Sequence, residues 1–184
     1  MNSVKRLFKL IVSPQSEWEA ISGEEGTTSE KLTSSLLYPI LGIFAIIVFF
    51  KEIEFTSLRS DSGIEKAIQY AAIAFIQFFS TYFAASYISK KIFKQLNTLR
   101  CNIYLIYLTS ITVLFYIIMT LFSKYVSYIA PLSLYIIYEA WIGYKYIDQG
   151  ADKTNSNFVV AMSTITLMLP LVISFILRTL LTLV

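Results

Sequence analysis

One acidic residue lies deep inside an apolar stretch of this sequence. Glu139 stands within LYIIYEAWIGYKYI, six residues before the nearest basic residue of that stretch. An ionisable side chain at such a depth in a membrane is costly and marks a functional site by default. Tyr135 lies four residues earlier on the same helix face, where its hydroxyl can hydrogen-bond the carboxyl group. We therefore take Glu139 and Tyr135 as a candidate intramembrane polar site.

A second polar residue, Gln77, is predicted to lie at a similar depth. At about 1.5 Å per residue, Glu139 is about 20 Å along its segment from Val126, and Gln77 is about 16 Å along its segment from Lys66. The two side chains could therefore meet. A further polar stripe follows the last apolar segment: Ser163, Thr166, Pro170 and Ser174. Together these residues predict either a sealed hydrogen-bond network or a small water-filled cavity, and the sequence leaves both open.

The chain lacks the residue types on which most catalysis and metal binding depend. It has no histidine, and Cys101 is its one cysteine, so a zinc site, a thiolate cluster and an intrachain disulfide are not expected. We find neither a Gly-rich phosphate loop nor paired catalytic carboxylates. The net charge is only +3, and no basic run carries interleaved aromatic residues, which argues against a nucleic-acid partner. We predict a protein that is not an enzyme and has no cofactor.

The composition of the chain and the lengths of its apolar segments are typical of a membrane protein. Of the 184 residues, 56% are apolar and only 15% are charged, and the charges cluster between long apolar runs. We predict an all-α, polytopic integral membrane protein with a five-span domain over residues 26–184. The predicted spans cover residues 32–50, 66–88, 101–122, 126–147 and 158–181. Because only SKY separates the third span from the fourth, these two should form a tight antiparallel hairpin.

The basic residues predict the orientation of the chain. With five spans, ten of the 15 lysine and arginine residues fall on the side that holds the N-terminus. Because basic residues accumulate in cytoplasmic loops, the N-terminus is predicted to be cytoplasmic and the C-terminus to lie on the opposite side. We expect the protein to be located in a bacterial cytoplasmic (inner) membrane.

Residues 1–25 precede the first span and predict two short helices that lie in the membrane interface. The first has an apolar stripe at helical spacing, with three basic residues largely off that stripe: Val4, Leu7, Phe8 and Ile11 against Lys5, Arg6 and Lys9. This pattern is typical of an amphipathic helix that lies on anionic lipid.

A second short helix is predicted to begin at Pro14. Ser13 suits the N-cap, Pro14 the first helical position, and Gly23 the end of the helix. Trp18 is expected at the membrane interface, where its amphipathic ring is favoured. The segment could serve only as an anchor, or it could dock a soluble partner through Pro14, Trp18 and the basic residues, with an acidic rim formed by Glu17, Glu19, Glu24 and Glu25.

The layout of the chain resembles bacterial members of the Yip (Ypt/Rab-interacting protein) family. The resemblance is carried by Pro14 and Trp18 in IVSPQSEWEAI, by TTSEKLTSSLLYP, and by LYIIYEAWIGYKYI followed by NFVVAMSTI. It implies a five-span helical domain with a cytoplasmic N-terminus and no catalytic residues. The Asp-Leu-x-Gly-Pro type signature of eukaryotic relatives has no counterpart here, so their association with small GTPases is not carried over.

Two functions remain open on the sequence alone. The first is a non-enzymatic scaffold, adaptor or membrane-organising protein of the Yip type, with the lipid bilayer as its partner and with anionic lipid at the N-terminal helix. A protein partner at the cytoplasmic face and a homo-oligomer are compatible with this function. The alternative is a small transporter or channel with a polar path around Glu139 and Gln77; five spans are few for a transporter, so it would need to oligomerise.

Overall fold

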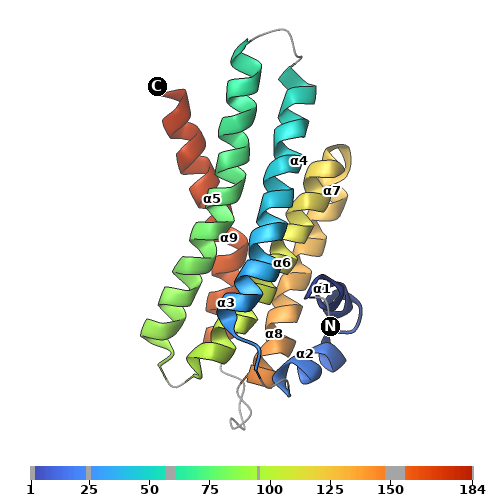
Figure 1. The fold of residues 1–184 in the computed structure, drawn as a ribbon, viewed down its shortest axis with the longest axis vertical. Coiled ribbons are helices and arrows are strands. Elements are labelled where there is room, and N and C mark those ends of the chain that lie inside the picture. The colour runs from blue at the N-terminus through green and yellow to red at the C-terminus, as the bar shows by residue number, and fades with distance from the viewer. Residues whose placement is uncertain (1–2, 24–25, 57–60, 95, 148–155, 184) are drawn as a thin grey trace.

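A computed structural model describes residues 3–23, 26–56, 61–94, 96–147 and 156–183, and this part of the chain is all helical. Long helices run side by side along the vertical axis of Figure 1, and two short N-terminal helices lie across them. In chain order the α-helices are α1 Ser3–Val12, α2 Pro14–Ser22, α3 Ser29–Leu32, α4 Tyr38–Thr56, α5 Asp61–Ile92, α6 Thr98–Leu121, α7 Val126–Ile129, α8 Tyr135–Ile147 and α9 Ser156–Thr182.

Four helical segments of the described chain are long and apolar enough to cross a membrane. They cover Ser29–Glu54, Gly63–Ile92, Thr98–Leu121 and Ser156–Thr182. Each exceeds the roughly 20 residues needed to span the hydrocarbon core of a bilayer. They correspond to the predicted spans 32–50, 66–88, 101–122 and 158–181, and they indicate an integral membrane protein.

The first of these segments contains a proline and remains helical. A π-helical turn, η1 (Thr33–Leu37), joins α3 to α4 immediately before Pro39, and the Tyr38 N–H donates to the Thr33 carbonyl five residues earlier. Proline has no N–H to donate, and its ring collides with the carbonyl four residues earlier in a regular α-helix. The wider π turn therefore ends two residues before Pro39, the residue that disturbs a regular α-helix.

The predicted span 126–147 is not one of the four long helices. The structure divides it into α7, a 3₁₀ segment η3 (Ala130–Leu134) and α8. The 13 residues of α8 measure about 20 Å, whereas the hydrocarbon core of a bilayer measures about 30 Å. Pro131 lies inside η3, and its missing N–H and the clash of its ring with the carbonyl four residues earlier disfavour a regular α-helix there. The single α-helix expected for this span is therefore replaced by three shorter pieces.

Helix α6 lies at the centre of the bundle. More than half of its side chains are buried, and it contacts α4, α5, α8 and α9 as well as α1. Asn97 caps its first turn, because the side-chain oxygen accepts hydrogen bonds from the N–H groups of Leu99 and Arg100 at 3.0 and 3.3 Å. The SKY residues form a 3₁₀ turn, η2 (Ser123–Tyr125), after which the chain reverses and α8 packs back against α6, as the hairpin prediction required.

The two N-terminal helices share the core of the bundle. Helix α1 packs against α6 and α2 packs against α8. The apolar stripe predicted for α1 is divided: Leu7 is buried and Ile11 is partly buried against the core, whereas Val4 and Phe8 are exposed. Contact with the bundle thus accounts for two of the four apolar positions of that stripe.

Candidate functional site

Trp18 is the largest side chain that is fully buried in the described residues. It is only 1% exposed, and its ring lies 5.7 Å from that of Tyr104 and 5.9 Å from that of Tyr107, both on α6. The expected position of Trp18 at a lipid or partner surface is therefore wrong. The ring points from α2 into the bundle because its apolar area is better covered by aromatic neighbours than by a polar interface.

Glu139 receives a hydrogen bond from this buried tryptophan. The Trp18 Nε1–H donates to Oε2 of Glu139 at 3.2 Å, and the Glu139 side chain is 0% exposed. A buried indole N–H needs an acceptor and a buried carboxyl group needs a donor, so each group removes the cost of leaving the other unpaired. The two residues are 121 positions apart in the sequence, and their bond joins α2 to α8.

Gly143 allows the tryptophan ring to approach the backbone of α8. It follows Glu139 by four residues and therefore lies on the same helix face. A Cβ atom at this position would stand 2.7 Å from Trp18 Cε2, 2.8 Å from Trp18 Cζ2 and 3.0 Å from Tyr104 Cε2. These distances are shorter than van der Waals contact, so only glycine fits here without a shift of its neighbours.

Two tyrosine hydroxyls also form hydrogen bonds between α8 and its neighbours α1 and α6. The Tyr135 hydroxyl donates to the Ile11 carbonyl at the end of α1, at 2.9 Å. The Tyr104 hydroxyl donates to the Ala140 carbonyl at 3.1 Å. Tyr135 lies one helical turn before Glu139, and its hydroxyl joins α8 to α1 instead of donating to the Glu139 carboxyl group. We call Trp18, Tyr104, Tyr135, Glu139 and Gly143 the Trp18 latch.

An ion pair holds α1 against α2 beside this latch. Nε of Arg6 lies 2.9 Å from Oε1 of Glu17, and Nζ of Lys9 lies 3.9 Å from Oε2. Glu17 is buried, so it cannot form part of an exposed acidic rim. Of the other residues assigned to that rim, Glu19 is exposed, while Glu24 and Glu25 lie outside the described residues.

Neutralising Arg6 should loosen this pair and lower stability moderately. We expect Arg6→Gln to reduce the free energy of unfolding by about 1 kcal/mol, because Lys9 still faces the buried Glu17 carboxylate. Titration with SDS in mixed micelles, followed by circular dichroism, measures this change. The exposed neighbour Lys5 provides the control: Lys5→Gln should change stability by no more than about 0.5 kcal/mol. Equal effects of the two substitutions would refute a specific role for Arg6.

The structure does not bring Gln77 to Glu139. Gln77 lines a cavity in company with Tyr116 and Arg178, whereas Glu139 bonds to Trp18. The predicted polar stripe of α9 does not join the two either, since Ser163 donates to its own helix at the Val159 carbonyl, 2.8 Å away. Position along a helix gives depth in the membrane but not direction. Gln77 and Glu139 therefore lie in different surroundings, although their depths would have allowed them to meet.

The exposed part of the N-terminal segment is the remaining candidate for binding. Lys5 and Lys9 are exposed on α1, next to the exposed apolar residues Val4, Phe8 and Val12. Pro14 begins α2 after the N-cap Ser13, as predicted. With Glu19 and Tyr138, Pro14 lines an open surface groove of about 470 Å³. Trp18, Tyr104, Glu139 and Gly143 of the latch are buried, and Tyr135 is partly buried, so the latch is a structural contact between helices.

Comparison of the chain with known proteins gives no relative from which a function could be transferred. Neither the protein-family models, the curated proteins nor the solved structures contain a match to this chain.

Proposed function

We propose that this protein is a non-enzymatic integral membrane scaffold that organises anionic lipid around its N-terminal helices. The observation that carries the proposal is the Trp18 latch. Because Trp18 is bonded to Glu139 and packed on Gly143, α2 is fixed to α8 and holds α1 in one position on the bundle. A helix that is held in place can present the same surface to the membrane in every copy of the protein.

The surface of α1 has the composition that lipid binding requires. On a helical projection of about 100° per residue, Val4, Phe8 and Val12 occupy one arc, and Lys5 and Lys9 lie at its edge. All five of these side chains are at least partly accessible, with Val12 as much as 81% exposed. Apolar residues can enter the acyl boundary while the adjacent ammonium groups face anionic headgroups.

The proposed topology keeps five crossings with a cytoplasmic N-terminus. Residues 126–147 would cross the membrane as the broken segment α7, η3 and α8, which runs back along α6 in Figure 1. Non-regular backbone at membrane depth is tolerated where protein covers it. In this topology ten of the 15 basic residues lie on the side of α1, which supports the proposal that α1 lies on the inner leaflet of a bacterial cytoplasmic membrane.

The resemblance to the Yip family agrees with a scaffold or adaptor role. In the proposal, Pro14 and the open groove beside it offer a site for a soluble protein partner, while Trp18 supports that site from inside. The alternative, a transporter with a path through Glu139 and Gln77, is less well supported because these residues lie in separate surroundings.

Quenching by spin-labelled lipid tests the proposal directly. A dye attached to Phe8→Cys, with the full chain in nanodiscs, should be quenched about twofold more by spin-labelled phosphatidylglycerol than by spin-labelled phosphatidylcholine. Removing both charges with Lys5→Gln and Lys9→Gln should abolish this preference, since each lysine near a surface contributes about 1 kcal/mol of attraction to anionic lipid. The native Cys101 is buried and should take up little dye.

Two further lysines provide a matched control. Lys90 and Lys91, in the last turn of α5, are exposed and can be changed to glutamine with the same loss of charge. That double variant should keep the preference for phosphatidylglycerol at Phe8. Equal quenching by both lipids in the unsubstituted protein would refute the proposal, and so would a dye that neither lipid quenches.

A further inference from the structure

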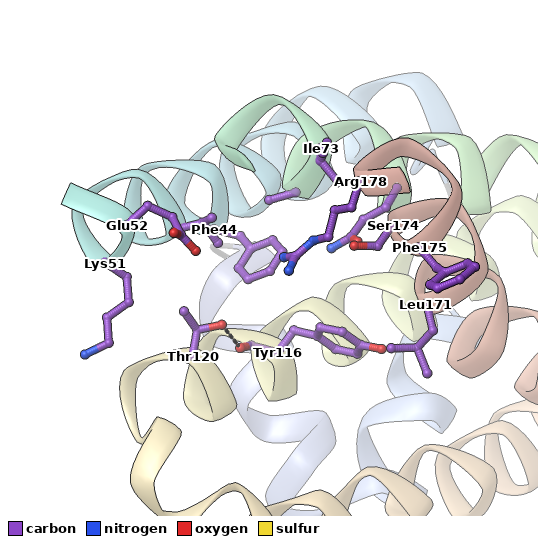
Figure 2. A pocket seen from close by; sticks show the side chains of 13 residues that line it. Phe44, Lys51, Glu52, Ile73, Tyr116, Thr120, Leu171, Ser174, Phe175 and Arg178 are labelled. Carbon is purple, nitrogen blue, oxygen red and sulfur yellow. Dashed lines mark hydrogen bonds between the residues drawn. The ribbon is translucent and has the colours of Figure 1, made fainter. Parts of the chain in front are cut away.

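A second polar region lies in the half of the bundle away from α1 and α2. It is a cavity of about 410 Å³ between α4, α5, α6 and α9, shown from close by in Figure 2. A volume of this size falls within the range of small-molecule and cofactor sites. Its walls carry both charged and apolar side chains, so the cavity can receive a molecule with a polar head and an apolar body.

Charged residues stand at the rim of the cavity. Lys51 and Glu52 come from the last part of α4, and Arg178 comes from the last part of α9. In Figure 2 the guanidinium group of Arg178 reaches from α9 toward the wall that bears Phe44. Its Cζ atom lies 4.7 Å from the centre of the Tyr70 ring, which holds the side chain in one orientation. A planar guanidinium group matches the oxygens of a phosphate better than an ammonium group does.

A glutamine side chain lines the same cavity. Gln77 is only 5% exposed and belongs to the cavity wall. A molecule in the cavity can therefore bond to its side-chain amide. The amide N–H₂ and the Arg178 guanidinium can both donate, which favours an acceptor-rich, anionic group as the occupant.

The apolar side of the cavity continues onto the outer surface of the protein. Leu171 and Phe175 of α9 line the cavity, and they are also 52% and 72% exposed. In a membrane that outer surface is covered by acyl chains. A ligand with its head in the cavity could therefore extend its chains over these two residues without leaving the lipid.

We propose that this cavity binds the phosphate-bearing head of a membrane lipid. Arg178 and Gln77 donate to the phosphate oxygens, and the acyl chains leave across Leu171 and Phe175. This cavity is formed by other helices and other residues than the proposed lipid-facing surface of α1, and it lies at another end of the bundle. Each of the two proposals can therefore fail without the other.

Native mass spectrometry of the full chain in non-ionic detergent tests this assignment with three probes. Dioleoyl phosphatidylglycerol should remain bound, whereas dioleoylglycerol, which lacks the phosphate, and glycerol 3-phosphate, which lacks the chains, should not. Arg178→Gln and Gln77→Leu should each lower retention of phosphatidylglycerol by about tenfold, as expected for the loss of a hydrogen bond to a charged group. Arg178→Lys should restore part of the binding, since it returns the charge without the planar fork.

Matched substitutions outside the cavity serve as controls. Gln69→Leu makes the same change two helical turns earlier on α5, and Lys124→Gln removes a positive charge from the exposed η2 turn. Both should retain phosphatidylglycerol as the unsubstituted protein does. Thermal unfolding in the same detergent checks that all variants are folded, and Arg178, which is exposed, should be replaceable without unfolding.

Three results would overturn the assignment. Equal retention of phosphatidylglycerol by cavity variants and controls would mean that the lipid belongs only to the annulus around the protein. Equal retention of dioleoylglycerol would mean that the phosphate is not recognised. Displacement of phosphatidylglycerol by an equal concentration of glycerol 3-phosphate would show that the occupant is a soluble phosphate compound and not a lipid.

Discussion

Replacing Trp18 by alanine is expected to lower the free energy of unfolding by about 3–5 kcal/mol, the cost of removing a large aromatic side chain from a closed core. Trp18 is fully buried between Tyr104, Tyr107 and Gly143, so the substitution leaves a cavity between α2 and the bundle. It also removes the N–H that bonds to Glu139, whose carboxyl group stays buried. Titration with SDS in mixed micelles measures the loss.

The second tryptophan of the chain gives a matched control for this prediction. Trp141 lies two residues after Glu139 on α8 but is 42% exposed. We expect Trp141→Ala to cost no more than about 1 kcal/mol, because it leaves little protein cavity. Trp18→Phe separates the two contributions at the buried site: it keeps an aromatic ring, loses the N–H donor, and should cost about 1–3 kcal/mol. If Trp141→Ala and Trp18→Ala destabilise the protein equally, the latch has no special role.

Adding one methyl group at Gly143 is expected to destabilise the protein by about 1–3 kcal/mol, the usual cost of overpacking a filled core. The new Cβ would stand within 3.0 Å of Trp18 and Tyr104, and both rings are enclosed by other side chains. Gly42 on α4 provides a comparison of opposite sign, because a Cβ there meets no atom within 4 Å. In that open position Gly42→Ala should stabilise the helix by up to about 1 kcal/mol.

A double substitution tests whether contact with Trp18 causes the loss of stability expected for Gly143→Ala. Trp18→Phe shortens the ring that the new Cβ would meet, so it should relieve part of the strain caused by Gly143→Ala. The two substitutions together should therefore cost less than the sum of their separate costs, as measured in the same SDS titration. Strict additivity would contradict the close approach of Trp18 to Gly143. So would a stabilising effect of Gly143→Ala alone.

The four long helices could be predicted from the sequence because apolar composition and length are local properties. The predicted spans 32–50, 66–88, 101–122 and 158–181 each lie within one continuous helical segment, except that 101–122 runs one residue past the end of α6. The effect of each proline on its helix was harder to predict from the sequence. Pro39 and Pro170 lie in helical segments that continue past them, whereas Pro131 lies where the α-helix is interrupted. Whether a proline kinks or breaks a helix depends on how neighbours satisfy the freed carbonyl, which hydropathy does not record.

The candidate site could be predicted only in part. An acidic residue in an apolar run identified Glu139, and helical spacing identified Tyr135 beside it. The donor to Glu139 was missed because Trp18 lies 121 residues away in a segment assigned to the interface. One signal was available in principle: a buried indole N–H requires an acceptor, and Glu139 is an acidic residue placed deep in an apolar run. Only the packing of α2 on α8 shows that the Trp18 indole and the Glu139 carboxyl group are partners.

The order in which a ribosome makes this chain gives the latch a further consequence. Trp18 is synthesised early, but the atoms that enclose it come from Tyr104, Glu139 and Gly143. During synthesis the Trp18 side chain therefore stays partly uncovered until the chain has been made beyond Gly143. Full burial of Trp18 is thus a late event in biogenesis, because it needs residues of both α6 and α8.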